Sequence, residues 1–110
     1  MEEGTIMLFL KFKQISTAEL QKELPMAPTI VDVREENEFQ TGHIPGAKNW
    51  PLSQITRGID EPDYPQPWYL ICHSGRRSKM AAKILSKSGY HVINVKGGMN
   101  AWQGAVTKAN

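Results

Sequence analysis

The stretch ICHSGRRSK, residues 71–79, holds the side chains best suited to covalent chemistry in this chain. Cys72 is the only cysteine, and Arg76 and Arg77 follow it within five residues. Fixed positive charges stabilise a thiolate, which is the nucleophilic form of cysteine. The stretch therefore predicts a nucleophilic Cys72 rather than the buried structural cysteine that a free thiol usually is.

The predicted elements around this loop support the same interpretation. Residues 67–72 form a strongly apolar predicted strand, and residues 76–90 form the best predicted helix. The free N–H groups of the first helical turn and the helix dipole would then favour an anion in the loop between them. Gly75 suits a backbone that must curl tightly there, and Ser74 and Ser78 would add hydroxyl donors.

Strands and helices alternate along the rest of the chain. The strands are predicted at residues 12–15, 29–33, 47–50, 67–72 and 91–95. The helices are predicted at residues 16–24, 34–42 and 76–90, with a closing helical turn at 97–102. This alternation predicts an α/β fold whose central, parallel, five-stranded sheet has helices on both faces.

Local signals help to set the ends and faces of these helices. Ser16 and Glu19 have the spacing of a capping box, and Gly42 is placed to end the second helix. In the helix at 76–90, an apolar stripe indicates the face that packs on the sheet. We predict these core side chains: Met80, Ile84 and Leu85 on the stripe, and Trp102 near the C-terminus.

The 110 residues are enough for one domain. We place the folded domain at residues 12–105, with a tail at 106–110. Residues 1–11 form an N-terminal extension that is either an edge strand or disordered. The proline-rich residues 60–67 are predicted to be a surface loop, because proline cannot donate to a strand ladder.

Composition excludes several classes of protein. One cysteine rules out an intramolecular disulfide framework, and it forms no paired zinc motif with the three histidines. The net charge of +2 is too small and too dispersed to indicate nucleic-acid binding. The longest apolar run, residues 6–10, is too short to span a bilayer and lacks the flanks of a signal peptide. We therefore expect a cytoplasmic protein that uses no metal or cofactor and binds neither nucleic acid nor membrane directly.

Three blocks together resemble one known family. The segment CHSGRRS, residues 72–78, is similar to the active-site loop of the rhodanese-like sulfurtransferases, in which four residues separate the cysteine from an arginine. VDVREENEFQTGHIPGAKN (31–49) and GGMNAW (97–102) are similar to the upstream and closing signatures of that family. The three blocks stand in the family's order and span nearly the whole chain.

The resemblance implies a rhodanese-like fold in which Cys72 carries a sulfane sulfur as a persulfide. Thiosulfate or another donor would supply the sulfur, and cyanide or cellular thiols would accept it, with a protein acceptor also possible. The backbone from His73 to Ser78 would cradle the terminal sulfur. Arg77 has the position of the family's loop arginine and would orient the loop and bind the anion, whereas Arg76 would project outward, either towards an anionic donor or into solvent. We expect the His73 side chain to face solvent.

The resemblance also implies supporting residues behind the loop. Asp32 and Arg34 match the family's Asp-x-Arg pair; we expect Asp32 to hold a loop arginine, and Arg34 to brace the scaffold through Glu35 or Glu38. Some family members have a second substrate-binding arginine where this chain has Glu38. Its absence favours a donor other than thiosulfate. His43, in the motif GHIPGA, is expected to be a hydrogen-bonded structural residue rather than a general base.

Other functions stay open at this point. A phosphatase or arsenate reductase also uses an anion-binding cysteine loop, but phosphatase loops have one residue more between cysteine and arginine, and this chain has no second thiol for a disulfide cycle. A non-catalytic rhodanese-like module that binds a partner is the second alternative. A redox-sensing role for the Cys72 thiol is the third.

Overall fold

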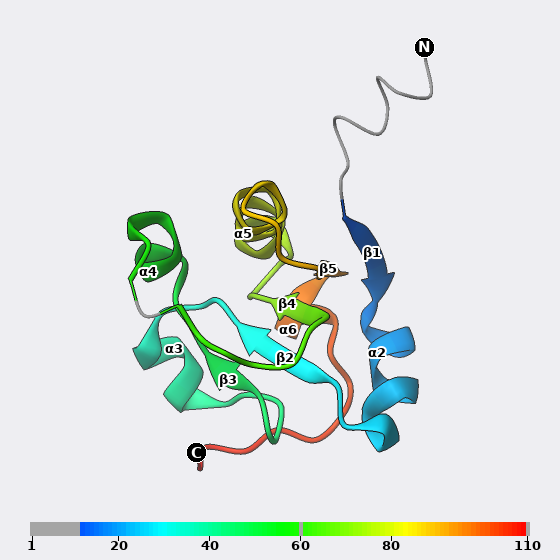
Figure 1. Ribbon diagram of the computed structural model, residues 1–110. Coiled ribbons are helices and arrows are strands. Elements are labelled where there is room, and N and C mark those ends of the chain that lie inside the picture. The colour runs from blue at the N-terminus through cyan, green and yellow to red at the C-terminus, as the bar shows by residue number, and fades with distance from the viewer. Residues whose placement is uncertain (1–11, 60, 110) are drawn as a thin grey trace.

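The centre of the protein is a parallel sheet of five strands (Figure 1). The computed structural model describes residues 12–59 and 61–109, so the N-terminal extension predicted at 1–11 lies outside the described residues. The strands lie in the order β1-β5-β4-β2-β3. Their bounds are β1 Lys13–Ser16, β2 Thr29–Asp32, β3 Lys48–Asn49, β4 Trp68–Ile71 and β5 Val92–Lys96. The predicted five-stranded parallel sheet is confirmed.

Helices cover both faces of this sheet, as predicted. The helical elements are α2 Thr17–Glu23, the short 3-10 helix η1 Leu24–Met26, α3 Glu36–Thr41, α4 Leu52–Arg57, α5 Arg76–Lys87 and α6 Gly98–Ala101. Helices α4 and α5 share one hydrophobic core with the sheet, and α2, α3 and α6 share the other. Sequence analysis missed α4, because this short helix buries only Ile55 completely and has too few apolar residues to show a helical period.

Strand β4 shows how the two cores divide the apolar side chains. Trp68 and Leu70 belong to the core under α4 and α5, as does Cys72 just after the strand, whereas Ile71 belongs to the core on the other face. Successive side chains of a strand point to opposite faces of the sheet. The position of Cys72 in the chain therefore places its sulfur on the α5 side of the sheet.

The two predicted helix ends are confirmed. The Ser16 hydroxyl accepts a hydrogen bond from the Glu19 N–H at 3.1 Å, and the Glu19 carboxylate accepts from the Ser16 N–H at 2.9 Å, which completes the capping box. The hydrogen bonds that the N–H and the hydroxyl of Ser16 donate to the Glu19 carboxylate lower the pKa of Glu19. Gly42 directly follows the last residue of α3, at a φ of 155°.

The predicted core stripe of α5 is wrong at Met80. This side chain is 53% exposed, whereas Leu85 is 3% exposed and Ile84 is partly buried. The buried face of α5 also includes Ala81 and Ala82, whose small side chains let the helix lie close to the sheet. The small residues were overlooked because they add little hydrophobicity. Trp102 is in the core, as predicted.

The C-terminal segment returns to the body of the domain. Thr107, within the predicted tail, forms an isolated antiparallel bridge with His43 through two backbone hydrogen bonds of 2.8 and 2.9 Å. Residues 61–67, the described part of the proline-rich segment, lie outside all helices and strands. Among residues 12–59 and 61–109, no helix combines the length and apolar character needed to cross a bilayer.

Alanine substitutions on α5 test the corrected core face. We expect Leu85→Ala to lower the free energy of unfolding by about 2–4 kcal/mol, because it leaves a cavity under the helix. Met80→Ala, on the exposed face, should change it by less than about 0.5 kcal/mol. Urea unfolding of both variants measures the difference. Equal losses would place Met80 in the core after all.

Candidate functional site

Cys72 follows β4 directly, and its loop ends at the first turn of α5. The cysteine is 1% exposed. The loop curls over the sulfur because Gly75 adopts a φ of 99°, in the left-handed region that favours glycine. A Cβ atom at Gly75 would also come within 3.1 Å of the Gly97 nitrogen, so a side chain here would crowd the neighbouring backbone.

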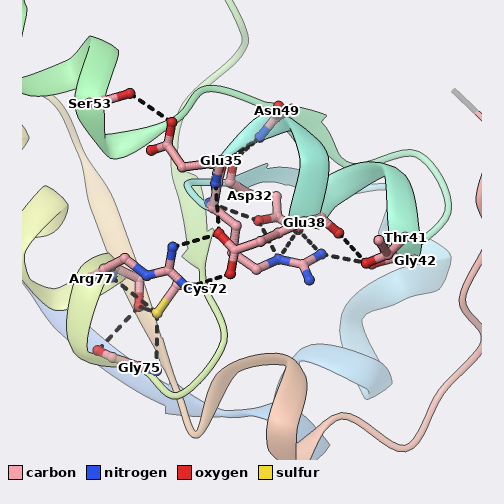
Figure 2. Close-up of polar contacts among 12 residues, drawn as sticks. Asp32, Glu35, Glu38, Thr41, Gly42, Asn49, Ser53, Cys72, Gly75 and Arg77 are labelled. Atoms are coloured by element: carbon pink, nitrogen blue, oxygen red, sulfur yellow. Dashed lines mark hydrogen bonds and ion pairs between the residues drawn. The ribbon is translucent and has the colours of Figure 1, made fainter.

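The loop presents backbone N–H groups to the sulfur. The Cys72 sulfur accepts a hydrogen bond from the N–H group of Gly75 at 3.1 Å (Figure 2). It accepts a second from the N–H group of Ser78 at 3.3 Å and donates to the Ser78 hydroxyl at 3.4 Å. Within the described residues, the N–H groups of Arg76 and Arg77 donate to no protein acceptor. The N-terminus of a 12-residue helix therefore adds partial positive charge around one sulfur atom.

Helix α6 holds the Cys72 loop in place through two backbone hydrogen bonds. The Cys72 carbonyl accepts a hydrogen bond from the Met99 N–H at 2.7 Å, and the His73 carbonyl accepts from the Asn100 N–H at 2.9 Å. Gly98 lies so close to these carbonyls that a Cβ atom there would overlap both of them. The closing signature at 97–102 thus contributes two glycines and the donors that hold the Cys72 loop in place.

Arg77 is held by Glu38 of helix α3. Its guanidinium donates two parallel hydrogen bonds to the Glu38 carboxylate, at 2.7 and 2.9 Å (Figure 2). These bonds from Arg77 lower the pKa of Glu38 to about 2, and the same contact raises the pKa of Arg77. The expectation that Asp32 holds the loop arginine is therefore wrong, because Glu38 of α3 takes that role.

Asp32 instead pairs with Arg34, two residues along the chain. The Arg34 side chain donates to the Asp32 carboxylate at 2.8–3.2 Å and to the Gly42 carbonyl at 2.7 Å. The expected partners Glu35 and Glu38 are therefore wrong for Arg34. Both members of the pair are buried, and the amide of Asn49 donates to both their carbonyls at 2.9 Å. The pair braces the end of β2 and the end of α3, and among the described residues it forms no hydrogen bond with Cys72.

The outer rim of the site is open and basic. A cavity of about 350 Å³ is lined by Ser74, Arg76, Arg77 and Met80. His73, Ser74 and Arg76 are exposed, as we expected for the His73 side chain. Among the described residues, Arg76 has no ion-pair partner, whereas the guanidinium of Arg77 is occupied by Glu38. Arg76 is therefore the cation at this rim that remains available to an incoming anion.

Sequence analysis included Ser78 as a hydroxyl donor of the loop but missed Asn94 and Gln14, the polar residues behind it. Ser78 donates from its hydroxyl to the Asn94 side-chain oxygen at 2.6 Å, and the Asn94 amide donates to the Gln14 side-chain oxygen at 2.9 Å. Asn94 is 1% exposed in the middle of β5. The available signal was an asparagine within the apolar strand HVINV, since a buried amide requires partners.

His43 is buried against α3 and has a structural geometry. Its Nδ1 lies 2.8 Å from the Phe39 carbonyl and therefore donates to it, and its ring stacks on the Phe39 ring at a centroid distance of 3.6 Å. The described residues contain no group of three His, Cys, Asp or Glu side chains that could hold a metal ion. A larger cavity, about 480 Å³, opens at the other end of the strands beside Thr29 and Lys48, and its lining includes no acid, histidine or cysteine.

Comparison with known proteins identifies relatives of this chain. The family described as "Rhodanese-like domain" matches residues 16–105. The "Thiosulfate sulfurtransferase GlpE" of Pseudoalteromonas translucida is 32% identical over 101 residues, which are 90% of this chain and 96% of that protein. The crystal structure of a rhodanese-like domain protein from Staphylococcus aureus superposes with a TM-score of 0.80 at 32% identity, covering 90% of this chain and 100% of that one.

A longer relative shares only part of its length with this chain. The "Putative sulfur carrier protein YrkF" of Bacillus subtilis is 46% identical over 76 residues, which are 68% of this chain and 41% of that protein. The chain thus spans less than half the length of that relative.

The ion pair between Glu38 and Arg77 predicts a pH dependence of stability. Because the folded pKa of Glu38, about 2, lies below its ordinary value of 4.5, the pair stabilises the fold fully above pH 4.5 and loses this effect as the pH falls towards 2. Both side chains are 35% exposed, and solvent screens their attraction, so the pair contributes about 1–2 kcal/mol to the free energy of unfolding.

We therefore expect wild type to lose about 1–2 kcal/mol more stability than Glu38→Gln between pH 6 and pH 2.5, as measured by urea unfolding at both values. The difference between the two proteins isolates Glu38 from the other carboxylates. Parallel losses in both would show that the pair adds no stability.

Proposed function

This chain belongs to the rhodanese-like domain family, and we propose from that premise that it is a sulfurtransferase that carries sulfane sulfur as a persulfide on Cys72. The observation that carries the proposal is the arrangement around the sulfur, which two backbone N–H groups hold at 3.1 and 3.3 Å at the start of α5. This environment stabilises a thiolate and the charge of a terminal sulfur through fixed dipoles.

In the first step, the Cys72 thiolate attacks the outer sulfur of the donor. With thiosulfate, a new bond joins the Cys72 sulfur to that outer sulfur, while the bond between the two sulfur atoms of thiosulfate breaks. The electron pair of the broken bond leaves with sulfite. The terminal sulfur of the persulfide then bears a negative charge, which the N–H groups of Arg76 and Arg77, free of protein acceptors among the described residues, would stabilise at the start of α5.

In the second step, a thiophilic acceptor removes the outer sulfur. A thiolate or cyanide attacks the terminal sulfur, and the bond to the Cys72 sulfur breaks with its electron pair, which regenerates the Cys72 thiolate. The product is a persulfide of the acceptor or thiocyanate. The N–H groups of Gly75 and Ser78 that hold the free sulfur in this structure stabilise Cys72 as the leaving group.

The rim of the site favours an anionic donor that approaches Arg76. The guanidinium of Arg77 is hydrogen-bonded to Glu38, so Arg77 serves to shape the loop. Arg76 is exposed beside the cavity. The exposed Met80 adds an apolar wall to the same cavity. Such a rim suits the sulfonate of thiosulfate and also an organic persulfide with a carboxylate.

The names of two relatives support a donor and a protein partner for this transfer. The name of the relative GlpE supports thiosulfate as a donor, and the name "sulfur carrier protein" of the relative YrkF supports transfer to or from a protein. The open, basic rim leaves room for an acceptor larger than cyanide.

The first test is the intact mass of the reduced protein after brief treatment with thiosulfate or with a glutathione persulfide. We expect wild type to gain one sulfur atom, which cyanide then removes as thiocyanate, and Cys72→Ser to gain none, because no other thiol is present. Wild type that is folded and reduced but gains no sulfur from either donor would contradict the proposal and favour a partner-binding or redox-sensing module.

A second test addresses the rim. Arg76→Gln should raise the KM for thiosulfate about fivefold and leave kcat nearly unchanged, because an exposed charged contact contributes about 1 kcal/mol to binding. Lys79→Gln is the matched control, since Lys79 is an exposed cation on the same helix but does not line the cavity. An equal rise in KM for both variants would indicate a general effect of charge instead of a contact at Arg76.

A further inference from the structure

A chain of hydrogen bonds leads from Cys72 across the core to the edge of the sheet. The Cys72 sulfur lies 3.4 Å from the Ser78 hydroxyl, which lies 2.6 Å from the Asn94 side-chain oxygen; the Asn94 amide lies 2.9 Å from the Gln14 side-chain oxygen. Gln14 and Asn94 are paired across β1 and β5, so both side chains point to the same face as α5.

The direction of these bonds depends on a single hydrogen atom. The Ser78 hydroxyl has one hydrogen to donate, and its contact with Asn94, at 2.6 Å, is much shorter than its contacts with the Gly75 carbonyl at 3.3 Å or with the Cys72 sulfur. The hydrogen therefore points to Asn94. The Ser78 oxygen consequently turns a lone pair towards Cys72 and accepts the hydrogen of the thiol.

Gln14 determines which end of the Asn94 amide faces Ser78. Because the Asn94 NH₂ group donates to the Gln14 oxygen, its carbonyl oxygen is left facing the Ser78 hydroxyl. Asn94 is 1% exposed, so water cannot substitute for these partners without opening the core. Gln14 of β1, on the far side of β5, therefore determines that the Ser78 oxygen, and not its hydrogen, faces the Cys72 sulfur.

We infer that Asn94 is a positioning residue for the chemistry of Cys72, acting through Ser78 and oriented by Gln14. It keeps the Ser78 hydroxyl hydrogen away from the sulfur, so that the hydrogen bonds to the thiolate from the described residues come from the N–H groups of Gly75 and Ser78. A thiolate that accepts fewer hydrogen bonds is a stronger nucleophile. Keeping the Ser78 hydroxyl hydrogen away therefore preserves the reactivity of the Cys72 thiolate towards the sulfur donor. The inference rests on the proposed sulfur transfer for its effect on rate, although the hydrogen-bond direction can be tested without it.

The direct test is the S–H stretching band of the protonated protein by Raman spectroscopy. Cys72 is the only cysteine, so the spectrum has one such band. We expect a lower frequency in wild type than in Ser78→Ala, in which the thiol has lost its acceptor. In Asn94→Leu the band should move towards that of Ser78→Ala and broaden, because the Ser78 hydroxyl is no longer oriented.

Two substitutions at the half-buried Gln14 provide a matched pair that leaves Asn94 in place. Gln14→Glu can only accept from the Asn94 NH₂ group, so it preserves the orientation and should keep the band of wild type. Gln14→Lys can only donate; it turns the Asn94 amide around, so that the NH₂ group faces Ser78 and the band moves towards that of Ser78→Ala. Identical bands in the Glu and Lys variants, or an unchanged band in Asn94→Leu, would overturn the inference.

The rate of sulfur loading tests the consequence for the reaction. At a pH at which the Cys72 thiol is fully ionised, the first-order loading rate should fall about threefold in Asn94→Leu and Gln14→Lys but not in Gln14→Glu, since one additional hydrogen bond lowers the basicity of a thiolate about tenfold and its nucleophilicity by about the square root of that factor. The KM for the donor should not change, because neither residue lines the rim cavity. If wild type itself does not load sulfur, the proposed function fails while the Raman bands still decide the inference. A normal band shift with unchanged loading rates would show that the orientation has no effect on the reaction.

Discussion

The hydrogen bonds from the N–H groups of Gly75 and Ser78 to the Cys72 sulfur impose the main constraint on this molecule. They require the chain to leave β4 and enter α5 within a loop short enough to enclose one atom. The left-handed Gly75 makes that loop possible, and the N–H groups at the start of α6 hold its carbonyls from below. Because the donors belong to the backbone, their positions depend on the packing of the whole sheet rather than on any flexible side chain.

Charges near the loop are divided between scaffold and site. Arg34 is buried with Asp32, and Arg77 is held by Glu38, so both arginines join segments of the fold. The pair of Arg77 with Glu38 links α5 to α3, which carries much of the upstream signature. Arg76, one residue earlier on the helix, remains exposed and unpaired among the described residues. The adjacent Arg76 and Arg77 thus have different surroundings, solvent for one and Glu38 for the other, because the helix turns by about 100° from one residue to the next.

The neutral residues beneath the sulfur complement these charges. Ser78, Asn94 and Gln14 bring polar groups from α5, β5 and β1 into a core that is otherwise apolar. A buried amide costs stability unless its polar atoms have hydrogen-bond partners. Here both the oxygen and the nitrogen of the Asn94 amide have one. A chain of neutral groups can orient a hydroxyl beside the thiolate without adding a second charge that would oppose it.

The sequence by itself determined the fold class, the place of the single cysteine in the loop before a helix and the two helix ends marked by Ser16 and Gly42, because these depend on local spacing. It did not reveal α4, whose single buried Ile55 shows no helical period, or the exposure of Met80, which follows from the close packing of Ala81 and Ala82. Only the tertiary structure decided that Glu38 holds Arg77, that Asp32 holds Arg34, and that Asn94 lies behind Ser78. Glu38 lies 39 residues from Arg77 in the chain, and Asn94 lies 16 residues from Ser78. Asp32 pairs with Arg34, only two residues along the chain, instead of with the loop arginine. Residue types state what a side chain can bind, but the packing of helices on a sheet decides which partner is within reach.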